Sequence, residues 1–590
     1  MKKITVIALL AAMIGFVGCG KKEGGPGNQY NLSTKNNVVW WQLSDVTNLI
    51  PYVSHDASAP YVFQMIWEPL NSSNPKTQEL IPWIASLPEV SPDHKVYTYT
   101  IRKDVTFSDG QPLTGEDVIY SFKTAMNPNI LDATSLGNYL NSVDSVALVG
   151  GDKYKVAFYL SEPYYLMDRV LGGGYVLILP KHIFDPNNMT DKIAWPNLKH
   201  GPVPSGPGKD YADKFDEISK DRSGKYYIGS GPYLFKSWRT NDNVTISLNK
   251  KYWAKDIPWG EAYVDEIIYK TITDPNAAVT ALKGKDVDFM DNVTPPALWV
   301  DIKQPYIKRD TYYFNVEAYL AWNSERPLFK DKKVRWALSH LVDRDQIINT
   351  VMKGLCQKVD GPIIFTQPNY CPEPPVSYNV DSAKALLAEA GWTDSDGDGV
   401  LDKVIDGKKI PFKFTFQTNA GNEARKQILL IVAEQLRKVG IQAEVQAVEW
   451  SVFLQNLRQH NFDACFSAIT GNAGEDDPFQ LWHSSQAKNR GSNIYSFINP
   501  EADKLLEQNR MEFDPVKRKA LMQRFSDIVH EEQPVTFLWA QPELMARIDR
   551  FDNVEFNRQR PCVAIPVWVV RGSGVTPKPG APSTVKETSK

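Results

Sequence analysis

The sequence predicts an α/β protein made of more than one lobe, and three observations support this fold class. The chain has 590 residues, which is more than one hydrophobic core usually organises. Apolar residues make up 42% of the chain and charged residues 23%, as in ordinary globular proteins. From about residue 277 onwards, segments of helical periodicity alternate with short apolar segments of strand length. Such strand–helix–strand units indicate lobes with partly parallel sheets.

The first nineteen residues have the features of a bacterial secretory signal. Lys2 and Lys3 precede an apolar run that ends at Val17, and Cys19 follows directly after a glycine. The run is too short to span a bilayer once the signal is processed. Cys19 resembles the cysteine of a lipobox, which predicts a signal peptide over residues 1–18 and a lipid on Cys19. The alternative is an ordinary signal peptide that contains a cysteine.

Residues 19–36 are predicted to be a flexible tether, because they are rich in Gly, Lys and Asn and offer little to bury. We therefore expect a body outside the cytoplasm that a lipid holds to a membrane, in the periplasmic space or at the cell surface. The net charge of −3 argues against a nucleic-acid partner, which would favour a concentrated basic surface.

Alternation and turn signals predict the elements of the first half of the chain. We expect strands at 38–41, 96–102 and 153–160, a hairpin of 233–238 with 244–248, and helices at 59–67 and 114–126. Thr114 followed by Asp117 is a capping pattern that marks the start of the second helix. Residues 195–225 are rich in Gly, Pro, Lys and Asp and are predicted to be a long surface excursion.

The second half is predicted to alternate between helices and strands. We expect helices at 277–282, 332–352, 380–390, 423–439 and 452–459, and strands at 287–290, 441–448, 463–469, 535–539 and 563–570. Gly440 is the expected end of the helix at 423–439. Residues 573–590, a tail rich in Pro, Gly, Ser and Thr, are predicted to be disordered.

Catalytic motifs are missing from the sequence. It contains no Gly-x-Ser-x-Gly elbow, no His-Glu-x-x-His, no Walker A loop and no dinucleotide fingerprint. His530-Glu-Glu-Gln lacks the second histidine of a zinc site and runs into Pro534. We therefore expect a protein that is not an enzyme and has no cofactor. A secreted hydrolase stays an alternative, because many hydrolases need only two carboxylates.

One acidic loop has the spacing of a calcium site. Asp394, Asp396, Asp398 and Asp402 occupy positions 1, 3, 5 and 9 of an EF-hand loop, and a glycine occupies position 6. Position 12, where a bidentate acid belongs, holds Ile405. The favoured interpretation is an Asx/Gly turn that joins a helix to a strand, and a metal site is the alternative.

Outside the cytoplasm two cysteines can oxidise to a disulfide. Cys356 and Cys371 flank a loop that contains Gly and Pro, and they are the predicted pair. Cys465 lies in a segment that reads as a buried strand, where a reduced core cysteine is expected.

Several motifs together resemble a known family. Residues 104–118 followed by Tyr120-Ser-Phe122 are similar to the signature F-x-D-G-x-P-(L/F)-T-A-x-D-V of solute-binding protein family 5. Further matches follow in the family's order, at residues 229–233 with 249–253, 321–323, 327–329, 334–338, 385–392 and 477–478. The chain is thus identified as a member of this family, which comprises the oligopeptide- and dipeptide-binding proteins of ABC importers.

The resemblance implies a periplasmic-binding-protein type II clamshell, with two α/β lobes on a hinge and an extra domain. Lobe I would consist of residues 37–70, 226–305 and 535–572, domain II of residues 71–225 and lobe III of residues 306–534. The chain would cross between the lobes near Pro305 and Pro534, and the strands there would form the hinge.

The resemblance also implies a function in transport. A monomer would capture an oligopeptide or dipeptide between lobes I and III and deliver it to a membrane permease with its ATPase. The alternatives are an oligosaccharide, an opine or a metal chelate as the solute, or a sensor or receptor without a transporter.

Peptide binders of the family hold the ligand's amino terminus with an aspartate just after the strand that matches 463–469. Here that position is Asn472 or Gly474, and Glu475 or Asp476 can substitute only if the loop is remodelled. Because ligands bind at the carboxyl ends of strands, we expect the loop that starts at Thr470 and Gly471 to line the cleft. Further expected cleft residues are Asp45, Asn48, Trp322, Asn323 and Trp450. The alternative for the two tryptophans is a partly buried core position, and for Asn323 a role in satisfying backbone groups.

Overall fold

The structure is a computed structural model, and it describes residues 30–54, 58–75, 77–130, 134–199, 201–471, 474–475, 477–488, 491–557 and 563–577. The signal peptide, Cys19, most of the predicted tether, Cys562 and residues 578–590 lie outside this described part.

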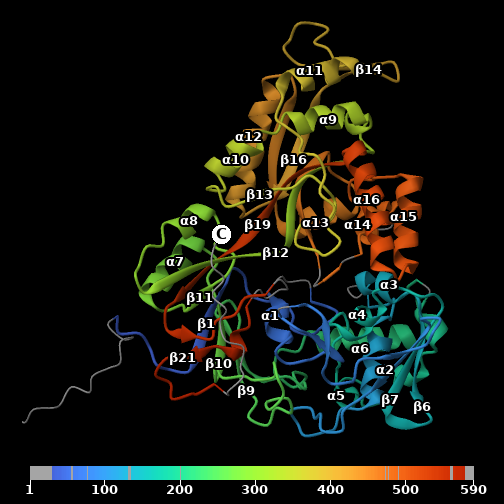
Figure 1. The fold of residues 1–590 in the computed structure, drawn as a ribbon, viewed down its shortest axis with the longest axis vertical. Coiled ribbons are helices and arrows are strands. Elements are labelled where there is room, and N and C mark those ends of the chain that lie inside the picture. Colours follow the sequence, from blue (N-terminus) through green and yellow to red (C-terminus); the bar gives the residue numbers. More distant parts are fainter. Residues whose placement is uncertain are drawn as a thin grey trace, which may run out of the picture.

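A mixed sheet of eleven strands runs through the described part of the chain and joins the two ends of the molecule (Figure 1). Its strands follow one another in space as β17 (Gln442–Val448), β16 (Lys413–Asn419), β18 (Ala464–Thr470), β12 (Ile307–Trp322), β19 (Val535–Ile548), β11 (Phe289–Met290), β1 (Asn37–Gln42), β10 (Glu266–Thr271), β9 (Asn243–Leu248) and β8 (Tyr233–Arg239). The short β13 (Gln357–Lys358) pairs with β19 beside this path. The predicted hairpin of β8 and β9 is present and antiparallel.

Two long antiparallel strands, β12 and β19, connect the lobes. They pair from Ile307 with Ile548 to Ala321 with Val535, and the register shifts between Tyr313 and Glu317. Ile307 and Ile548 pack in one core with β11 and α7 (Pro275–Gly284), whereas Ala321 and Val535 pack in a core at the other end. The two strands that begin directly after Pro305 and Pro534 thus run from one core to the other.

Lobe III is built on β16, β17 and β18, in which β16 lies between parallel neighbours. Even-numbered residues of β12, such as Leu320 and Trp322, face one core, and odd-numbered residues, such as Tyr319, face another. The helices of this lobe are α9 (Lys332–His340), α10 (Arg344–Thr350), α11 (Val380–Glu389), α12 (Glu423–Arg437), α13 (Trp450–Arg458), α14 (Phe479–Trp482), α15 (Pro500–Met511) and α16 (Pro515–Glu532). A small hairpin of β14 (Asp402–Ile405) and β15 (Lys408–Pro411) lies apart from the main sheet.

Domain II holds a separate antiparallel sheet and shares one continuous core with lobe I. The strands of this sheet are β4 (Glu89–Val90), β5 (Val96–Thr100), β7 (Asp152–Leu160) and β6 (Val143–Val149). Its helices are α2 (Gly115–Ala125), α3 (Thr134–Leu140), α4 (Met167–Gly172), α5 (Lys181–Phe184) and α6 (Pro207–Ser219), and β2 (Asn71–Ser73) pairs with β3 (Leu80–Pro82). Lobe I adds α1 (Ala59–Phe63) and α8 (Pro296–Val300). At the start of α2 the backbone N–H of Thr114 donates to Asp117 at 2.8 Å, as the capping pattern predicts.

Several predicted elements differ from the structure. The helix expected at 59–67 ends at Phe63, and the strand expected at 535–539 extends to Ile548. The expected excursion at 195–225 contains α6, whose Tyr211 and Phe215 are fully buried because they lie one helical turn apart on the core side. The helix expected at 332–352 is divided, because Asp343 accepts a hydrogen bond from the N–H of Gln346 and starts a new helix there. The strand expected at 563–570 is reduced to β21 (Val569–Val570), which pairs with β20 (Phe551–Asp552).

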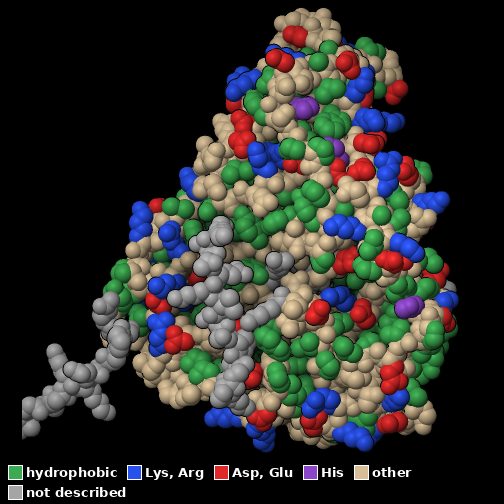
Figure 2. All heavy atoms as spheres, viewed as in Figure 1, with side chains coloured by type: hydrophobic (Ala, Val, Ile, Leu, Met, Phe, Trp, Pro, Cys, Tyr) green, Lys and Arg blue, Asp and Glu red, His purple; other side chains and the backbone are tan. Residues whose placement is uncertain are grey.

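Short 3-10 turns complete the described secondary structure, at Thr190–Lys192, Trp195–Leu198, Pro327–Phe329, Ser484–Ala487 and Ile565–Val567. Within the residues that the structure describes, no helix is both long enough and apolar enough to cross a membrane. On the face shown in Figure 2, acidic and basic side chains are interspersed and do not gather into a patch of one sign.

Candidate functional site

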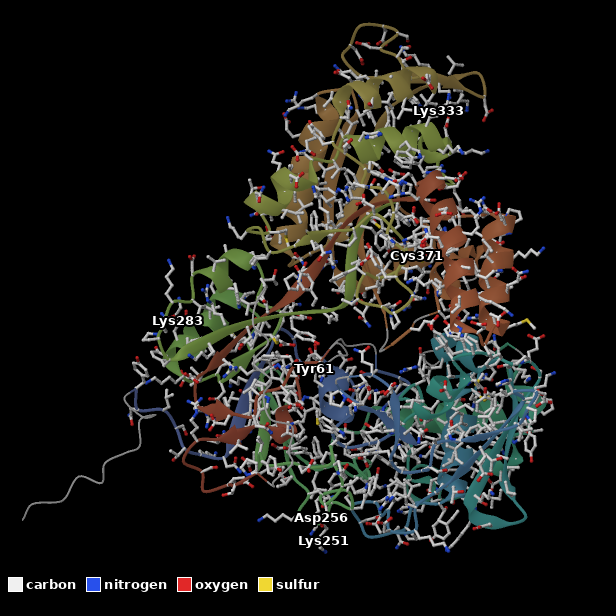
Figure 3. All side chains as sticks on the ribbon, in the orientation of Figure 1. Tyr61, Lys251, Asp256, Lys283, Lys333 and Cys371 are labelled. Atoms are coloured by element: carbon white, nitrogen blue, oxygen red, sulfur yellow. The ribbon has the colours of Figure 1, made fainter. Side chains whose placement is uncertain are left out.

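The carboxyl ends of the parallel strands in the two lobes face each other across the middle of the sheet. β1 runs parallel to β11, and β11 runs antiparallel to β19, so the ends of β1 and β11 point toward lobe III. β18 runs antiparallel to β12, so its end at Thr470 points toward lobe I. Figure 3 shows Tyr61 of α1 on the side of lobe I that is nearest lobe III. Loops at the carboxyl ends of strands are where ligands bind in α/β sheets.

A cavity of about 120 Å³, which we call the hinge cavity, lies between these facing ends. Lobe I contributes Asn292 and Thr294 from the loop after β11, and lobe III contributes Asn422 and Arg425 at the start of α12. Its floor is formed by the two long strands that join the lobes, including Gln541 of β19. Because its walls come from both lobes, any relative movement of the lobes changes its size.

Arg425 supplies a cation to the hinge cavity. Its guanidinium donates to Asn419 Oδ1 at 3.0 Å and lies 5.1 Å from the ring centre of Phe466. Burial lowers the pKa of this guanidinium. Helix α12 begins directly beside it, with Asn422 capping the first turn. Positive charge and a helix N-terminus favour an anion on this side of the cavity, whereas Glu543 places a carboxyl group on the side formed by β19.

The loop after β18 contacts the connecting strand β12 and domain II. The N–H of Gly471 donates to the carbonyl of Asn315 in β12 at 2.9 Å, and the N–H of Gly474 donates to Gln78 Oε1 of domain II at 2.7 Å. Gly474 has a φ of +75°, a conformation that favours glycine, and a Cβ there would lie 2.8 Å from a guanidinium nitrogen of Arg169. Asn472 and Asp476, which the sequence predicts as ligand contacts, lie outside the described residues.

Glu475, the described acid of this loop that the sequence assigns to the ligand, already has a partner. Its carboxylate binds the Arg518 guanidinium through two contacts, at 2.8 and 3.1 Å. The next described acid, Asp477, pairs with Arg510 at 2.7 Å. Both carboxylates therefore already have an arginine partner in this conformation.

Asp45, Asn48 and Trp450 lie at the ends of elements that face the other lobe. Asp45 accepts hydrogen bonds from Trp238 Nε1 at 3.2 Å and from the N–H of Asn241 at 2.8 Å. Asn48 Oδ1 accepts from the N–H of Ile50 at 2.7 Å. Both side chains thus shape the loop after β1. Trp450 begins α13 directly after β17 and is 49% exposed.

Trp322 and Asn323 are core residues and do not line the cleft, which corrects the sequence prediction. Trp322 is fully buried, and its Nε1 donates to Thr536 Oγ1 at 3.0 Å. Asn323 is also fully buried, and its amide donates to the carbonyl of Phe462 at 2.8 Å. The ring of Trp322 packs against Phe329, Phe414 and Phe416, which explains its burial.

Glu317 is a residue that the sequence analysis missed. It lies on β12 just after the register shift, is 1% exposed and accepts a hydrogen bond from the N–H of Phe365 at 2.7 Å. Its second carboxylate oxygen is buried and has no hydrogen-bond partner among the described residues. Burial raises the pKa of Glu317 to about 8. The feature of the sequence that could have identified Glu317 is a single acid among the apolar and aromatic residues of a strand.

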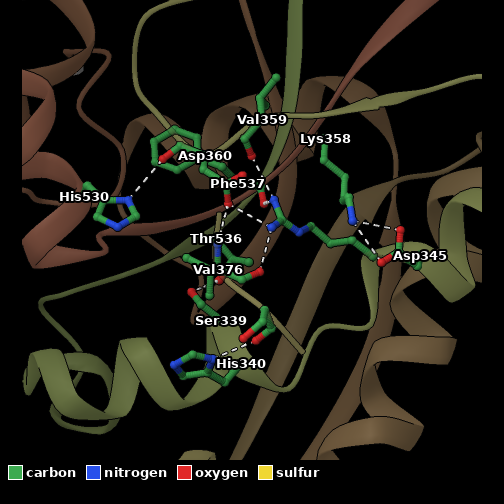
Figure 4. A network of polar contacts seen from close by, with 12 residues as sticks. Ser339, His340, Asp345, Lys358, Val359, Asp360, Val376, His530, Thr536 and Phe537 are labelled. Carbon is green, nitrogen blue, oxygen red and sulfur yellow. Dashed lines mark hydrogen bonds and ion pairs between the residues drawn. The ribbon is translucent and has the colours of Figure 1, made fainter. Parts of the chain in front are cut away.

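A network around Arg344 fixes the segment that contains Phe365, whose N–H donates to Glu317. Figure 4 labels Val359, Asp360 and Val376 of this network. The Arg344 guanidinium donates to the carbonyls of Val359 at 2.9 Å and Val376 at 2.7 Å, and it pairs with Asp360 at 2.8 Å. Both charged side chains are buried, so each compensates the other. The network ties the segment from Val359 to Val376 to α10 and β19.

A second and larger cavity, of about 310 Å³, lies in lobe I and domain II. Trp83, Trp259 and Glu261 line it, together with Gln78, which accepts the hydrogen bond from Gly474 of lobe III. One carboxylate oxygen of Glu261 is buried and lacks a hydrogen-bond partner within the described part of the chain. This cavity therefore borders the loop after β18.

The predicted disulfide between Cys356 and Cys371 is absent, because both thiols are free. Cys356 packs at the edge of one lobe III core, and Cys371 is buried in the other, so the packing separates them. Cys371 Sγ donates to the carbonyl of Asn369 at 3.2 Å. Burial raises the pKa of the Cys356 thiol to about 12.

The acidic loop brings together three of its four predicted ligands. Carboxylate oxygens of Asp394, Asp396 and Asp398 lie within 4.8 Å of one another, and all three residues are exposed. Asp402 is instead held by the hydroxyl of Ser395 at 2.6 Å. Asp394 accepts hydrogen bonds from the backbone of its own turn, in keeping with the favoured Asx/Gly interpretation.

Comparison with known proteins shows extensive similarity. Residues 79–491 match the family described as bacterial extracellular solute-binding proteins, family 5 Middle. The chain is 31% identical over 527 residues to the oligopeptide-binding protein AppA of Bacillus subtilis, and the match covers 88% of each chain.

The structure is also similar to solved structures of oligopeptide-binding proteins. The structure of AppA from Bacillus subtilis in complex with a nonapeptide superposes with a TM-score of 0.74 at 29% identity, over 90% of this chain and 98% of that one. The oligopeptide-binding protein of Thermus thermophilus with a pentapeptide superposes with a TM-score of 0.76 at 20% identity, over 93% of this chain and 98% of that one. The predicted clamshell fold is confirmed by this likeness.

Proposed function

Because this chain belongs to the bacterial extracellular solute-binding proteins of family 5, we propose that it is the solute-binding component of an ABC importer. It captures a solute between lobes I and III, closes by bending β12 and β19, and presents the closed form to a membrane permease with its ATPase. The observation that carries this proposal is the hinge cavity, whose walls come from both lobes and whose floor is the connecting strand pair. The division into lobe I, domain II and lobe III belongs to the proposal, with the crossing placed inside β12 and β19.

An oligopeptide or dipeptide is the proposed solute. The similarity to AppA supports this, since that protein is an oligopeptide-binding protein and its structure holds a nonapeptide. The cation of Arg425 and the N-terminus of α12 suit a carboxylate at one end of the cleft. A micromolar affinity, about −8 kcal/mol, needs only a few such polar contacts with buried apolar surface. Binding leaves the solute chemically unchanged, and no catalytic step is part of the proposal.

A non-peptide solute is the second candidate, and one observation favours it. Glu475 is committed to Arg518 and Asp477 to Arg510, so the described part of the loop presents no uncommitted carboxylate to the amino terminus of a peptide. An oligosaccharide, an opine or a metal chelate does not require that charge.

The location of the protein is also proposed. A signal peptide over residues 1–18, a lipid on Cys19 and a flexible tether would keep a monomer at a membrane outside the cytoplasm. Treatment of cells with and without an inhibitor of lipoprotein signal cleavage tests this, because a lipidated chain accumulates as an uncleaved precursor when cleavage is blocked.

Native mass spectrometry of the freshly purified protein, followed by titration calorimetry, tests the choice of solute. We expect a co-purified mass that peptidase removes, and heat of binding from a pool of tri- to nonapeptides. Heat from an oligosaccharide panel alone would refute the peptide assignment and favour the second candidate.

A further inference from the structure

Domain II contacts lobe III along a surface that is separate from the hinge cavity. We call this surface the seam. It is formed by residues on both sides, which are Gln78, His94, Tyr164 and Tyr165 of domain II and Gly474, Asp477, Arg510, Phe513 and Arg518 of lobe III. Figure 1 shows α15 and α16 of lobe III directly above α3 and α4 of domain II. None of these residues lines the hinge cavity.

Asp477 is the centre of the seam. Its side chain is fully buried, and its Oδ2 accepts hydrogen bonds from Tyr164 Oη of domain II at 2.9 Å and from Arg510 Nε of its own lobe at 2.7 Å. Its Oδ1 accepts from the N–H of Phe479 at 3.1 Å, which fixes the carboxylate at the start of α14. Hydrogen bonds to a charged acceptor are about twice as strong as neutral ones.

Arg510 holds this carboxylate in position. Its guanidinium lies 3.7 Å from the ring centre of Phe479 and 5.3 Å from that of Tyr164. The backbone carbonyl of Arg510 accepts the N–H of Tyr165 at 3.0 Å, which is a second hydrogen bond across the seam. Arg510 belongs to the last turn of α15, so the helix presents both its side chain and its carbonyl to domain II.

Contacts beside Asp477 extend the seam. The Arg518 guanidinium, which pairs with Glu475, lies 4.3 Å from the ring centre of Tyr165. On the far side His94 stacks on Phe513, with ring centres 3.7 Å apart and an angle of 22° between the rings. These contacts join parts of the chain that are separated by several hundred residues, and they exist only while domain II and lobe III touch.

We propose that Asp477, Arg510 and Tyr164 are positioning residues that set the affinity for solute without contacting it. Arg510 and Phe479 preorganise the Asp477 carboxylate within lobe III, and Tyr164 docks onto it when the lobes close. The seam therefore stabilises the closed form even when no solute is present. Since the apparent dissociation constant equals the intrinsic constant divided by the fraction of competent molecules, a weaker seam lowers affinity. The role of the seam in closure is independent of the proposed function, whereas its effect on peptide affinity rests on the proposed function.

Tyr164→Phe is the test variant, because it keeps the ring and removes only the hydroxyl that crosses the seam. The matched control is Tyr495→Phe, in which the lost hydroxyl donates to the carbonyl of Leu481 within lobe III at 2.7 Å. Hydrogen exchange of the ligand-free protein measures closure at the amides of Tyr165 and Gly474, whose acceptors lie in the opposite part of the molecule. We expect exchange roughly tenfold faster in Tyr164→Phe. The control should stay within about twofold of the wild type at these amides.

The affinity for a pool of penta- to nonapeptides gives the second readout. We expect it to fall roughly tenfold in Tyr164→Phe, through faster release, and to be unchanged in Tyr495→Phe. Arg510→Gln should have at least as large an effect, Arg510→Lys should restore part of it, and Arg524→Gln is its control. Arg524 pairs with Glu501 across α15 and α16 inside lobe III, so its loss does not touch the seam.

The outcomes separate the two proposals. Unchanged exchange of the seam amides in Tyr164→Phe overturns the role of the seam, whatever the peptides do, because this variant leaves lobe III intact. Faster exchange without any binding of peptides by the wild type supports the role of the seam in closure and refutes only the peptide assignment. Faster exchange with unchanged peptide affinity overturns the claim that the seam sets affinity.

Discussion

Replacing Glu317 by Gln should abolish a loss of stability that the wild-type protein suffers as the pH rises. Burial raises the pKa of Glu317 from its ordinary value of 4.5 to about 8. The folded protein thus keeps this proton to a higher pH than the unfolded chain does. The stabilising contribution is complete below about pH 4.5, falls as the pH rises toward 8 and is lost above it. The difference between the two pKa values corresponds to roughly 5 kcal/mol.

Urea unfolding at pH 5, 6, 7, 8 and 9 measures this effect in the wild type and in Glu317→Gln. The amide keeps an oxygen that accepts the hydrogen bond from Phe365, and it carries no charge to bury at high pH. We expect the difference between the free energy of unfolding of the variant and that of the wild type to increase by several kcal/mol in favour of the variant from pH 5 to pH 9. Parallel pH profiles of the two proteins would refute the reasoning, because they would mean that Glu317 does not titrate at the hinge.

Three further substitutions have defined outcomes. Trp322→Ala should lower the free energy of unfolding by about 3–5 kcal/mol in urea titrations, because it empties a core position, and should leave the peptide affinity of the folded protein unchanged. Weaker binding of peptides with normal stability would mean that Trp322 lines the cleft. Arg344→Met should cost about 3–5 kcal/mol because it leaves Asp360 buried and unpaired, and an unchanged melting temperature would contradict the network in Figure 4. Trp450→Ala should change the free energy of unfolding by less than about 0.5 kcal/mol, since the side chain is half exposed, while calorimetry should show weaker binding of peptides. The same peptide affinity in the variant and the wild type would mean that Trp450 is not part of the site.

Lobe III was the part of the fold most accessible from sequence. The helix at Glu423–Arg437 and the strand that follows it have strong periodicity, and Gly440 marks the end of that helix with a φ of +83°. The strand before the helix, β16, was not predicted. Helix α6 was missed because Gly, Pro and Lys dominate its surroundings, although Tyr211 and Phe215 have helical spacing. The division between α9 and α10 depends on one capping side chain, Asp343, within a stretch of continuous helical pattern.

The site was harder to predict than the fold. Alternation places Trp322 on a strand, but only the packing of lobe III shows that both faces of that strand are covered. The importance of Asp477 depends on Tyr164, which lies 313 residues away in the sequence. Glu317 was overlooked because an acid in a strand ordinarily faces solvent, whereas the loop fixed by Arg344 covers this one.

Small-angle scattering of the protein, stripped of solute and then saturated with a peptide that calorimetry has shown to bind, tests the central claim most directly. We expect the radius of gyration to fall on saturation, because the lobes rotate about β12 and β19 to enclose the peptide. An identical radius of gyration with and without bound peptide would contradict closure of the lobes over the solute.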